Sequence, residues 1–510
     1  MSELKYTPID EIEQIHSDLR KGFLSGKLKS IPYRKQQILN LAYLLKDNIE
    51  RFQKAFEADL GRCTLEADFL EINATITEVK GAYYGVEKWA KPEKSPLSMN
   101  WTAMRPVTRK EPKGVVLIIS PFNYPIWLSL GPLAGAIAAG NAAVIKPSEL
   151  TPTISALVAE LFPKYLDPEL FRVVNGAVPE TTKILELQWD HILYTGGGRV
   201  AKVVATAAAK HLTPISLEVG KSPVIVDPKC DLKTAAKRIL WGKMANAGQT
   251  CVAPDYILVP QEFQDPLVDA LTEVYHSFYP SGPAESNSFG RIITINHAER
   301  IKRLLDNSKG TIVVGGPGEC DTSKKYIAPT IVKDVGADDS LMSEEIFGPV
   351  LPIVPVKDLD EAIKFVNARD HPLALYVFSS ENSTKNKVFD NTQSGACVAN
   401  EVLIHTAAEG LPFGGTGPSG SGYHTGKYSF DMFTHLRASM DSPSWLEILL
   451  GARYPPYDDK KAKALSKLSN ISLPARSGSG SSPTRWFLFA LVLAGLAVLT
   501  KRGRLGGFIR

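Results

Sequence analysis

The sequence predicts an α/β protein with two doubly wound lobes, and three observations support this prediction. From residue 115 onward, short apolar runs of the kind that form buried parallel strands follow one another. Segments with helical character separate these runs, which is the order of βαβ units. The alternation starts again at Ala235 and continues to about Asn400. Two such lobes in one chain imply a cleft between them, and doubly wound sheets bind ligands beyond the carboxyl ends of their strands.

The N-terminal part of the chain, from about residue 8 to residue 94, is rich in Lys and Glu and is helical in its periodicity. Between Ile38 and Leu45, for example, apolar residues recur at spacings of three and four. This part therefore predicts helices that each pack on a core through one face.

Predicted strands and helices alternate in both α/β series. In the first series the strands are residues 115–119, 142–145, 172–174, 191–194 and 223–226, and the helices are residues 126–139, 154–162 and 199–210. In the second series the predicted strands are residues 257–259, 311–314, 350–354 and 375–378. We expect each lobe to contain a parallel sheet that is buried on both faces.

The C-terminal part differs in composition from the rest of the chain. Residues 477–483 are Ser, Gly and Pro, which predicts a flexible spacer. Residues 486–500 carry no charge, and Arg485 and Lys501 flank them. As a helix they span about 22 Å against a hydrocarbon core of about 30 Å, and flanking basic side chains can snorkel to the interface. We predict a transmembrane anchor; a C-terminal helix docked on the soluble lobes is the alternative.

Composition and charge argue against several classes of protein. The chain is 44% hydrophobic and 22% charged, with a net charge of +4, and no basic run carries interleaved aromatics, so we expect no nucleic-acid partner. Its five cysteines are scattered, which argues against a disulfide framework, and no cluster has the spacing of a metal site. The first 18 residues contain no apolar run, so we expect no secretory signal and catalytic lobes in the cytosol.

Cys251 is the candidate nucleophile. It lies in residues 246–254, NAGQTCVAP, where small neighbours leave room for a substrate to approach the thiol. We expect backbone N–H dipoles or nearby cations to favour its thiolate form. The other four cysteines lack such a setting. For a single cysteine, the alternative is a buried structural role.

The segment around Cys251 resembles the nucleophile motif of the aldehyde dehydrogenase superfamily. Its core is GQTC, and the extension VAPDY at residues 252–256 is similar to the class 3 and fatty-aldehyde branch. The resemblance covers the chain from about residue 10 to about residue 440 and rests on several motifs in the family's order. It implies that the Cys251 thiolate attacks an aldehyde and that a hydride passes to NAD, with NADP as the alternative, to leave a thioester.

Residues 120–125, SPFNYP, resemble the segment whose Asn amide forms the family's oxyanion hole with the backbone N–H of the nucleophile. In this chain these groups are the Asn123 side chain and the N–H of Cys251. One such donor is typically worth about 10²–10³ in rate. Phe122 stands where the family usually has Trp, which exchanges one apolar residue for another. Without the resemblance, Asn123 between two prolines indicates a turn.

Residues 217–223, LEVGKSP, resemble the family's LELGGKSP, whose Glu activates the water that hydrolyses the thioester. The match gives this role to Glu218. This chain has one residue fewer between Glu218 and Lys221, in the turn that aims the carboxylate. Either the turn compensates for the missing residue or thioester hydrolysis is impaired.

Two further motifs imply a bound dinucleotide. A Gly-rich turn at residues 194–201 follows a predicted strand and opens a predicted helix, and it supplies Gly196 and Val200 as candidate cofactor contacts. Lys146 and Glu149 match the family's contacts to the adenosine ribose, where a carboxylate favours the free 2′-hydroxyl of NAD. Without the resemblance, both are ordinary loop charges.

The motif EEIFGP matches the family segment whose second Glu holds the nicotinamide ribose and whose Phe packs on the same end of the cofactor. Here these residues are Glu345 and Phe347; without the resemblance, the segment is a charged turn before a strand. Residues 411–417 complete the family pattern with glycines that let the chain pass close to the site. His424 lies in a segment similar to the class 3 tail, and we expect a structural role because nothing in the sequence pairs it with Cys251.

The resemblance also implies a Rossmann-type cofactor lobe, a catalytic lobe and a small β arm for oligomerisation. The predicted boundaries are residues 1–217 for the cofactor lobe (98–113 contributing to the arm), 218–410 for the catalytic lobe, 411–445 for the return segment and arm, 446–476 for a gating and juxtamembrane segment, 477–485 for a linker and 486–500 for the anchor. We expect a homodimer with a single-pass tail anchor in the endoplasmic reticulum or the mitochondrial outer membrane. In the gating segment, Ile448, Leu449 and Leu450 are candidates to line the substrate entrance; ordinary packing on the protein body is the alternative.

We therefore expect an enzyme that oxidises medium- to long-chain fatty aldehydes to carboxylic acids. An aromatic aldehyde of the hydroxybenzaldehyde type is the alternative substrate. A catalytically weak membrane adaptor that retains the fold is a further alternative. It is supported by the short turn after Glu218 and by Phe122.

Overall fold

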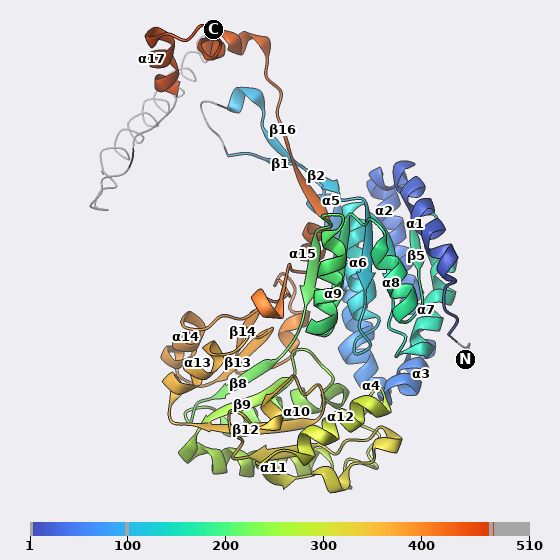
Figure 1. The fold of residues 1–510 in the computed structure, drawn as a ribbon, viewed down its shortest axis with the longest axis vertical. Helices are drawn as coiled ribbons and strands as arrows, with labels where there is room; N and C mark the ends of the chain where they lie inside the picture. Colours follow the sequence, from blue (N-terminus) through green and yellow to red (C-terminus); the bar gives the residue numbers. More distant parts are fainter. Residues whose placement is uncertain (1–3, 97–100, 469–472, 474–510) are drawn as a thin grey trace, which may run out of the picture. The chain divides into compact units, whose positions relative to one another are not determined.

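Two mainly parallel sheets organise the larger part of the chain (Figure 1). The computed structural model describes residues 4–96, 101–468 and 473. The chain divides into a main unit, Met1–Glu93 with Thr108–Ala438, and a second unit, Lys94–Val107 with Ser439–Arg510. All candidate catalytic and cofactor residues named above belong to the main unit.

The N-terminal helices share one apolar core with the first sheet. They are α1 (Ile9–Leu24), α2 (Ile31–Lys46), α3 (Ile49–Leu60), α4 (Thr64–Ala67) and α5 (Asn73–Trp89). α2 begins after Ser30, whose side chain accepts a hydrogen bond from the N–H of Tyr33, and a proline in its first turn lacks the N–H that would stay unpaired there. A π-helical turn, Asp68–Ile72, joins α4 to α5 and buries Glu71.

The first sheet has the strand order β15-β7-β6-β3-β4-β5. Its strands are β3 (Val115–Ile119), β4 (Ala142–Lys146), β5 (Phe171–Val173), β6 (His191–Thr195), β7 (Ile215–Glu218) and β15 (Gly420–Ser421). The pairings are parallel except that of β15 with β7. The chain runs from β3 to β4 and β5 on one side and to β6 and β7 on the other. The order thus reverses between β3 and β6, the place where doubly wound sheets bind ligands.

Helices connect the strands of this first sheet. They are α6 (Trp127–Ala139), α7 (Pro152–Tyr165), α8 (Val178–Glu186) and α9 (Gly198–Ala209), and α15 (Lys427–Met432) packs against α6. β3 is buried along its whole length, as its continuous apolar sequence predicts.

The second sheet has the order β10-β11-β12-β9-β8-β13-β14 and its own apolar core. Its strands are β8 (Ser222–Val226), β9 (Pro254–Pro260), β10 (Thr311–Val314), β11 (Thr330–Lys333), β12 (Val350–Val356), β13 (Ala374–Phe378) and β14 (Ala396–Ala399). The helices that alternate with them are α10 (Leu232–Met244), α11 (Gln264–Phe278), α12 (Ile295–Asp306), α13 (Leu359–Asn367) and α14 (Asn382–Asp390). The pairings are parallel except that of β10 with β11. The prediction of two α/β lobes is therefore confirmed, and each predicted strand overlaps an observed one.

A third, small sheet has the order β1-β2-β16, with strands β1 (Glu93–Lys94), β2 (Val107–Pro112) and β16 (Thr434–Ser439). The second unit contains the short helices α16 (Glu447–Leu450) and α17 (Asp459–Leu468). Among the described residues, none of the helices is both long enough and apolar enough to cross a bilayer. The predicted linker, residues 477–485, and the predicted anchor, residues 486–500, lie outside the described residues. The predicted domain boundaries stay predictions.

Candidate active site

A strained loop presents the candidate nucleophile Cys251. α10 ends at Met244, and the 3₁₀ turn that follows holds Asn246, Ala247 and Gly248 at φ values of 52°, 52° and 75°. A Cβ on Gly248 would overlap the backbone carbonyl of Gly348, so this position requires glycine. The buried Asn246 amide ties the loop together with a hydrogen bond of 3.0 Å to the carbonyl of Gln249. Such strain is typical of functional loops that their surroundings hold in place.

Cys251 lies on the wall of a cavity of about 910 Å³ within the main unit. The cavity is formed by α5, by the start of α6 and by residues that surround Cys251 and His424 in sequence. Large apolar side chains dominate its lining: Phe69, Leu70, Tyr84, Trp89, Tyr124, Trp127, Leu128, Trp241, Val252, Leu403, Ile404 and Phe413. A nucleophile at the wall of an apolar cavity indicates a substrate with a large apolar part.

The carboxylate of Glu218, the candidate base, lies beside Cys251. The Cys251 sulfur lies 3.9 Å from Glu218 Oε1. Burial, followed by the charges of Glu218 and Glu345, raises the pKa of the Cys251 thiol well above its usual value. Backbone N–H groups act in the opposite direction, but they are outweighed. The sequence-based expectation that dipoles or cations favour the thiolate is therefore wrong for the protein without ligands, because burial and two carboxylates dominate.

His424 is the partner of Glu218 that the sequence did not reveal. Its Nε2–H donates a hydrogen bond of 2.9 Å to Glu218 Oε2, and the Thr195 hydroxyl donates to the same oxygen at 3.3 Å. Burial opposes protonation of His424, but the charge and hydrogen bond of Glu218 outweigh it, so the pKa of His424 is raised. The sequence thus did not predict that His424 pairs with the candidate base and lines the cavity; the expectation of a structural role stays a prediction.

The shortened turn after Glu218 packs directly against the nucleophile. The N–H of Val219 donates to the carbonyl of Ser419 at 2.9 Å, and β15 continues this pairing opposite Glu218. A Cβ on Gly220 would overlap the carbonyl oxygen of Cys251, so the turn and the nucleophile loop are in backbone contact. With one residue fewer than the family pattern, the turn still brings the carboxylate to the sulfur.

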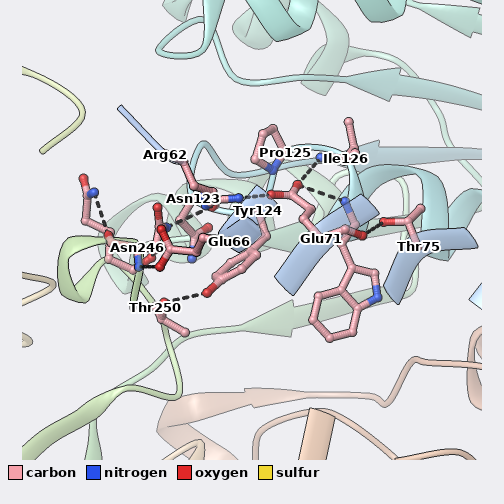
Figure 2. Close-up of polar contacts among 12 residues, drawn as sticks. Arg62, Glu66, Glu71, Thr75, Asn123, Tyr124, Pro125, Ile126, Asn246 and Thr250 are labelled. Carbon is pink, nitrogen blue, oxygen red and sulfur yellow. Dashed lines mark hydrogen bonds and ion pairs between the residues drawn. The ribbon is translucent and has the colours of Figure 1, made fainter. Parts of the chain in front are cut away.

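Asn123 lies in the loop between β3 and α6 and is buried. Its carbonyl oxygen accepts a hydrogen bond of 3.0 Å from Asn246 Nδ2, and the hydroxyls of Tyr124 and Thr250 are 2.9 Å apart (Figure 2). Two contacts thus join this loop to the nucleophile loop. Within the part of the chain that the structure describes, no hydrogen bond of the Asn123 side-chain amide is found, and Asn123 is 2% exposed.

The candidate cofactor residues gather at the carboxyl ends of β4 and β6. Lys146 Nζ lies 2.8 Å from Glu149 Oε2 just beyond β4. At the end of β6, Gly196 has φ +157°, and a Cβ there would overlap the hydroxyl of Tyr194. Gly197 gives α9 no side-chain cap, and Val200 in its first turn is exposed, so the N-terminus of α9 can receive an anionic group such as a pyrophosphate. These features fit a dinucleotide at the point where the strand order reverses.

Glu345 and Phe347 lie between β11 and β12. The Phe347 ring meets the edge of the Phe122 ring at 5.7 Å between centroids, so the residue that replaces the family's Trp packs on the predicted cofactor contact. Burial, and next the charge of Asp255, raises the pKa of Glu345 well above its usual range. Among the described residues, no group of three His, Cys, Asp or Glu side chains is arranged to hold a metal ion.

Comparison with known proteins gives a consistent result. Residues 4–439 match the Aldehyde dehydrogenase family. The chain is 44% identical over 457 residues to aldehyde dehydrogenase family 3 member B3 of Mus musculus, which covers 89% of this chain and 95% of that protein. It is also 44% identical over 438 residues to the dimeric NADP-preferring aldehyde dehydrogenase of Rattus norvegicus, covering 86% and 96% of the two chains. A structure of the substrate-bound state of Staphylococcus aureus AldH has a TM-score of 0.86 at 40% identity and covers 90% of this chain and 99% of that one.

The family match spans most of the sequence, and the candidate site places a cysteine and a carboxylate together. The chain therefore belongs to the aldehyde dehydrogenase family and is an NAD(P)-dependent enzyme that oxidises aldehydes to carboxylic acids.

Proposed function

We propose that this enzyme oxidises medium- to long-chain fatty aldehydes with NAD, through a thioester on Cys251 that Glu218 helps to hydrolyse. One observation carries the proposal: the Cys251 sulfur lies on the wall of an apolar cavity of about 910 Å³, 3.9 Å from the Glu218 carboxylate. A nucleophile with a base in contact and room for substrate is the arrangement that covalent oxidation of an aldehyde requires.

In the first half of the reaction, the Cys251 sulfur attacks the carbonyl carbon while Glu218 takes the thiol proton. The carbonyl oxygen becomes an oxyanion, which the Asn123 amide and the Cys251 N–H hold by hydrogen bonds. Loss of a hydride from the same carbon leaves a thioester, and a bound NAD supplies the hydride acceptor.

In the second half, a water molecule attacks the thioester carbon. Glu218, which has first released the thiol proton to solvent, takes a proton from this water and passes it to the Cys251 sulfur as the carbon–sulfur bond breaks, which restores the thiol. Overall, aldehyde, water and NAD give carboxylic acid, NADH and a proton.

The walls of the cavity favour a long alkyl chain. Each methylene group that leaves water for an apolar wall gains about 0.8 kcal/mol, so affinity should rise with chain length until the cavity is filled. We expect kcat/KM to rise from propanal to dodecanal or beyond. A preference for benzaldehydes would instead support the aromatic alternative, and absence of NADH formation from every aldehyde would support the adaptor. The Cys251→Ala variant, which should form no NADH but still bind NAD, is the control.

The preference for NAD over NADP is proposed from Glu149. Its carboxylate, held 2.8 Å from Lys146, would repel the 2′-phosphate of NADP and accept a hydrogen bond from a free 2′-hydroxyl. The similarity to a relative named NADP-preferring makes this a necessary test. In Glu149→Gln the ratio of kcat/KM for NADP to that for NAD should rise about tenfold, as expected for loss of one charge repulsion. An unchanged ratio would remove Glu149 from the adenosine site.

Membrane attachment is proposed from residues 486–500, with the catalytic lobes in the cytosol and the anchor in the endoplasmic reticulum or mitochondrial outer membrane. In the second unit, Trp445 and Ile448 are 55% and 87% exposed, as expected of side chains that meet a lipid interface. That the segment around Ile448 gates the substrate entrance stays a prediction. Alkaline carbonate should leave the full chain in the membrane pellet and release a chain truncated after Pro483. Release of both would indicate a docked helix.

A homodimer is proposed through the arm that contains β2 and β16. These strands form a small sheet, and a relative of 44% identity is named dimeric. Sedimentation equilibrium of the chain truncated after Pro483 should give twice the monomer mass at micromolar concentration. A monomer at that concentration would contradict the proposal.

A further inference from the structure

A fully buried ion pair lies next to the candidate oxyanion hole. Arg62, between α3 and α4, pairs with Glu71 of the π-helical turn, and neither side chain has any exposed surface (Figure 2). Burying two charges costs several kcal/mol each, and their mutual attraction often does no more than offset this cost. The chain therefore keeps a pair that contributes little net stability, at a position that contacts the active-site loop.

Both members of the pair bind the backbone of that loop: Arg62 as a hydrogen-bond donor and Glu71 as an acceptor. Arg62 Nη2 donates a hydrogen bond of 2.7 Å to the carbonyl of Asn123. Glu71 Oε1 accepts from the N–H of Ile126 at 2.7 Å and from the N–H of Trp127 at 3.2 Å, at the N-terminus of α6. Hydrogen bonds to charged groups are about twice as strong as neutral ones. We call Arg62 and Glu71 the clamp.

A neighbouring carboxylate, on α4, contacts the nucleophile loop that holds Cys251. Glu66 accepts a hydrogen bond of 2.6 Å from the N–H of Asn246, whose side chain in turn reaches the carbonyl of Asn123. The carbonyl oxygen of Asn123 thus accepts hydrogen bonds from both the Arg62 and the Asn246 side chains. Its peptide plane is therefore fixed from two sides.

The arrangement around Arg62 favours a role in positioning. The guanidinium lies over the rings of Phe56 and Tyr124, and within the described residues its Nε finds no hydrogen-bond acceptor. An unpaired buried N–H lowers stability, so the site is not arranged for stability alone. The atoms of Arg62 that do find acceptors reach the Asn123 carbonyl and Glu71.

We propose that Arg62 and Glu71 are positioning residues that aim the Asn123 amide at the oxyanion formed on Cys251. The inference rests on the proposed covalent mechanism and adds to it. An oxyanion-hole donor is effective only when it meets the place where charge develops, so a shift of the Asn123 backbone should slow the chemical step and leave binding unchanged.

The test compares Arg62→Lys in two backgrounds. Lysine keeps the charge but lacks the planar fork that reaches two acceptors at once. In the native background we expect kcat to fall about tenfold with KM for aldehyde and the dissociation constant for NAD unchanged. In the Asn123→Ala background the same change should cost less than about twofold, because residues that act as a unit are not additive. Acylation of Cys251 by 4-nitrophenyl acetate, which needs no cofactor, should show the same pattern.

Arg34→Lys is the matched control. Arg34 is also buried and donates to two backbone carbonyls, those of Leu28 and Ala138, but it does not contact the Asn123 loop. Its replacement should lower the melting temperature and leave kcat within about twofold. If Arg62→Lys does not fold, Glu71→Gln, an isostere that keeps the pair's volume, takes its place in the same comparison.

The outcomes separate the two proposals. An equal loss from Arg62→Lys in both backgrounds, or a rise in KM that accounts for the loss, would overturn the clamp while leaving the mechanism intact. If Asn123→Ala alone leaves acylation unchanged, the proposed oxyanion hole fails, and the clamp fails with it. If Arg62→Lys lowers kcat in the native background and has little effect in the Asn123→Ala background, the clamp is supported.

Discussion

Glu71 and Glu218 are both buried carboxylates with a basic partner, but they differ in the number and kind of groups that bind their oxygens. Glu71 is bound by a permanently charged guanidinium and two backbone N–H groups. Glu218 is bound by an imidazole, by a hydroxyl at 3.3 Å and by a thiol at 3.9 Å. The partners of Glu218 can change protonation or move, whereas those of Glu71 cannot. The comparison supports a division of roles in which Glu71 holds the site in shape and Glu218 can exchange its partners, as the proposed base must.

The largest effect is expected from Glu218→Gln, which removes the base. We expect steady-state turnover to fall by about 10²–10⁴, the usual contribution of a general base. Because the thiol pKa of Cys251 is raised, the first formation of NADH should slow at neutral pH and recover as pH rises, whereas thioester hydrolysis should not recover. Rapid mixing across pH, followed at 340 nm, separates the two steps. Equal recovery of both would show that Glu218 does not serve the water.

The second effect is on stability and comes from Glu71→Gln. Removing one partner of a buried pair typically costs about 3–5 kcal/mol, because the Arg62 charge stays behind unpaired. Urea unfolding should show this loss for Glu71→Gln and little loss for Glu218→Gln, since active-site groups are often retained at the expense of stability. The reverse order of stabilities would contradict the division of roles between the two carboxylates.

The sequence predicted strands and motifs that depend on neighbouring residues. It did not predict contacts between residues that are far apart in the sequence. β3 and β8 are continuous apolar runs and were predicted at nearly their observed bounds. β7 escaped prediction because only alternate residues are buried in it, and four residues are too few to show a period. Cys251 and Glu218 stand in motifs that can be read locally.

The clamp and His424 carry no comparable local signal. Glu71 follows Arg62 by nine residues, but their shared target Asn123 is 61 residues away from Arg62. His424 and Glu218 are 206 residues apart, and a purely structural role for the histidine was the sequence-based expectation. A single sequence does not show which distant polar residues meet, because pairing energy appears only after the apolar core has brought them together. The wrong expectation about the Cys251 thiolate has the same cause, since burial is a property of the folded chain.

A smaller effect, on pH dependence, is expected from His424→Asn. The pKa of His424 is raised by Glu218, and Glu78 on α5 also faces it. Below this pKa the protonated imidazole holds the Glu218 carboxylate and weakens it as a base; as pH rises through it, the base is released. The acid limb of kcat against pH should therefore move to lower pH in His424→Asn. The stabilising contribution of the pair should be present at low pH and be lost as pH rises through the same pKa.

His405→Asn is the matched control for this prediction. His405 is also packed against Phe413, but burial lowers its pKa to about 4, so it stays neutral over the range of the assay. Its replacement should leave the acid limb where it is. An acid limb that stays in place in His424→Asn, or moves equally in both variants, would show that His424 does not control the base.

The smallest effect is expected from Phe122→Trp, which restores the residue usual in the family. Phe122 is half-buried and meets the edge of Phe347, the predicted contact to the nicotinamide end of the cofactor. An indole can make the same kind of contact, and because Phe122 is only half-buried the larger ring should find room without the strain of an overpacked core. We expect kcat and the KM for NAD to stay within about twofold. Phe122→Leu loses the aromatic pair, worth about 0.5–1.5 kcal/mol, and should raise the KM for NAD by about two- to twelvefold with kcat less affected. Steady-state kinetics with NAD varied at saturating aldehyde measures both variants. If leucine is tolerated as well as tryptophan, the contact between Phe122 and Phe347 does not support the cofactor.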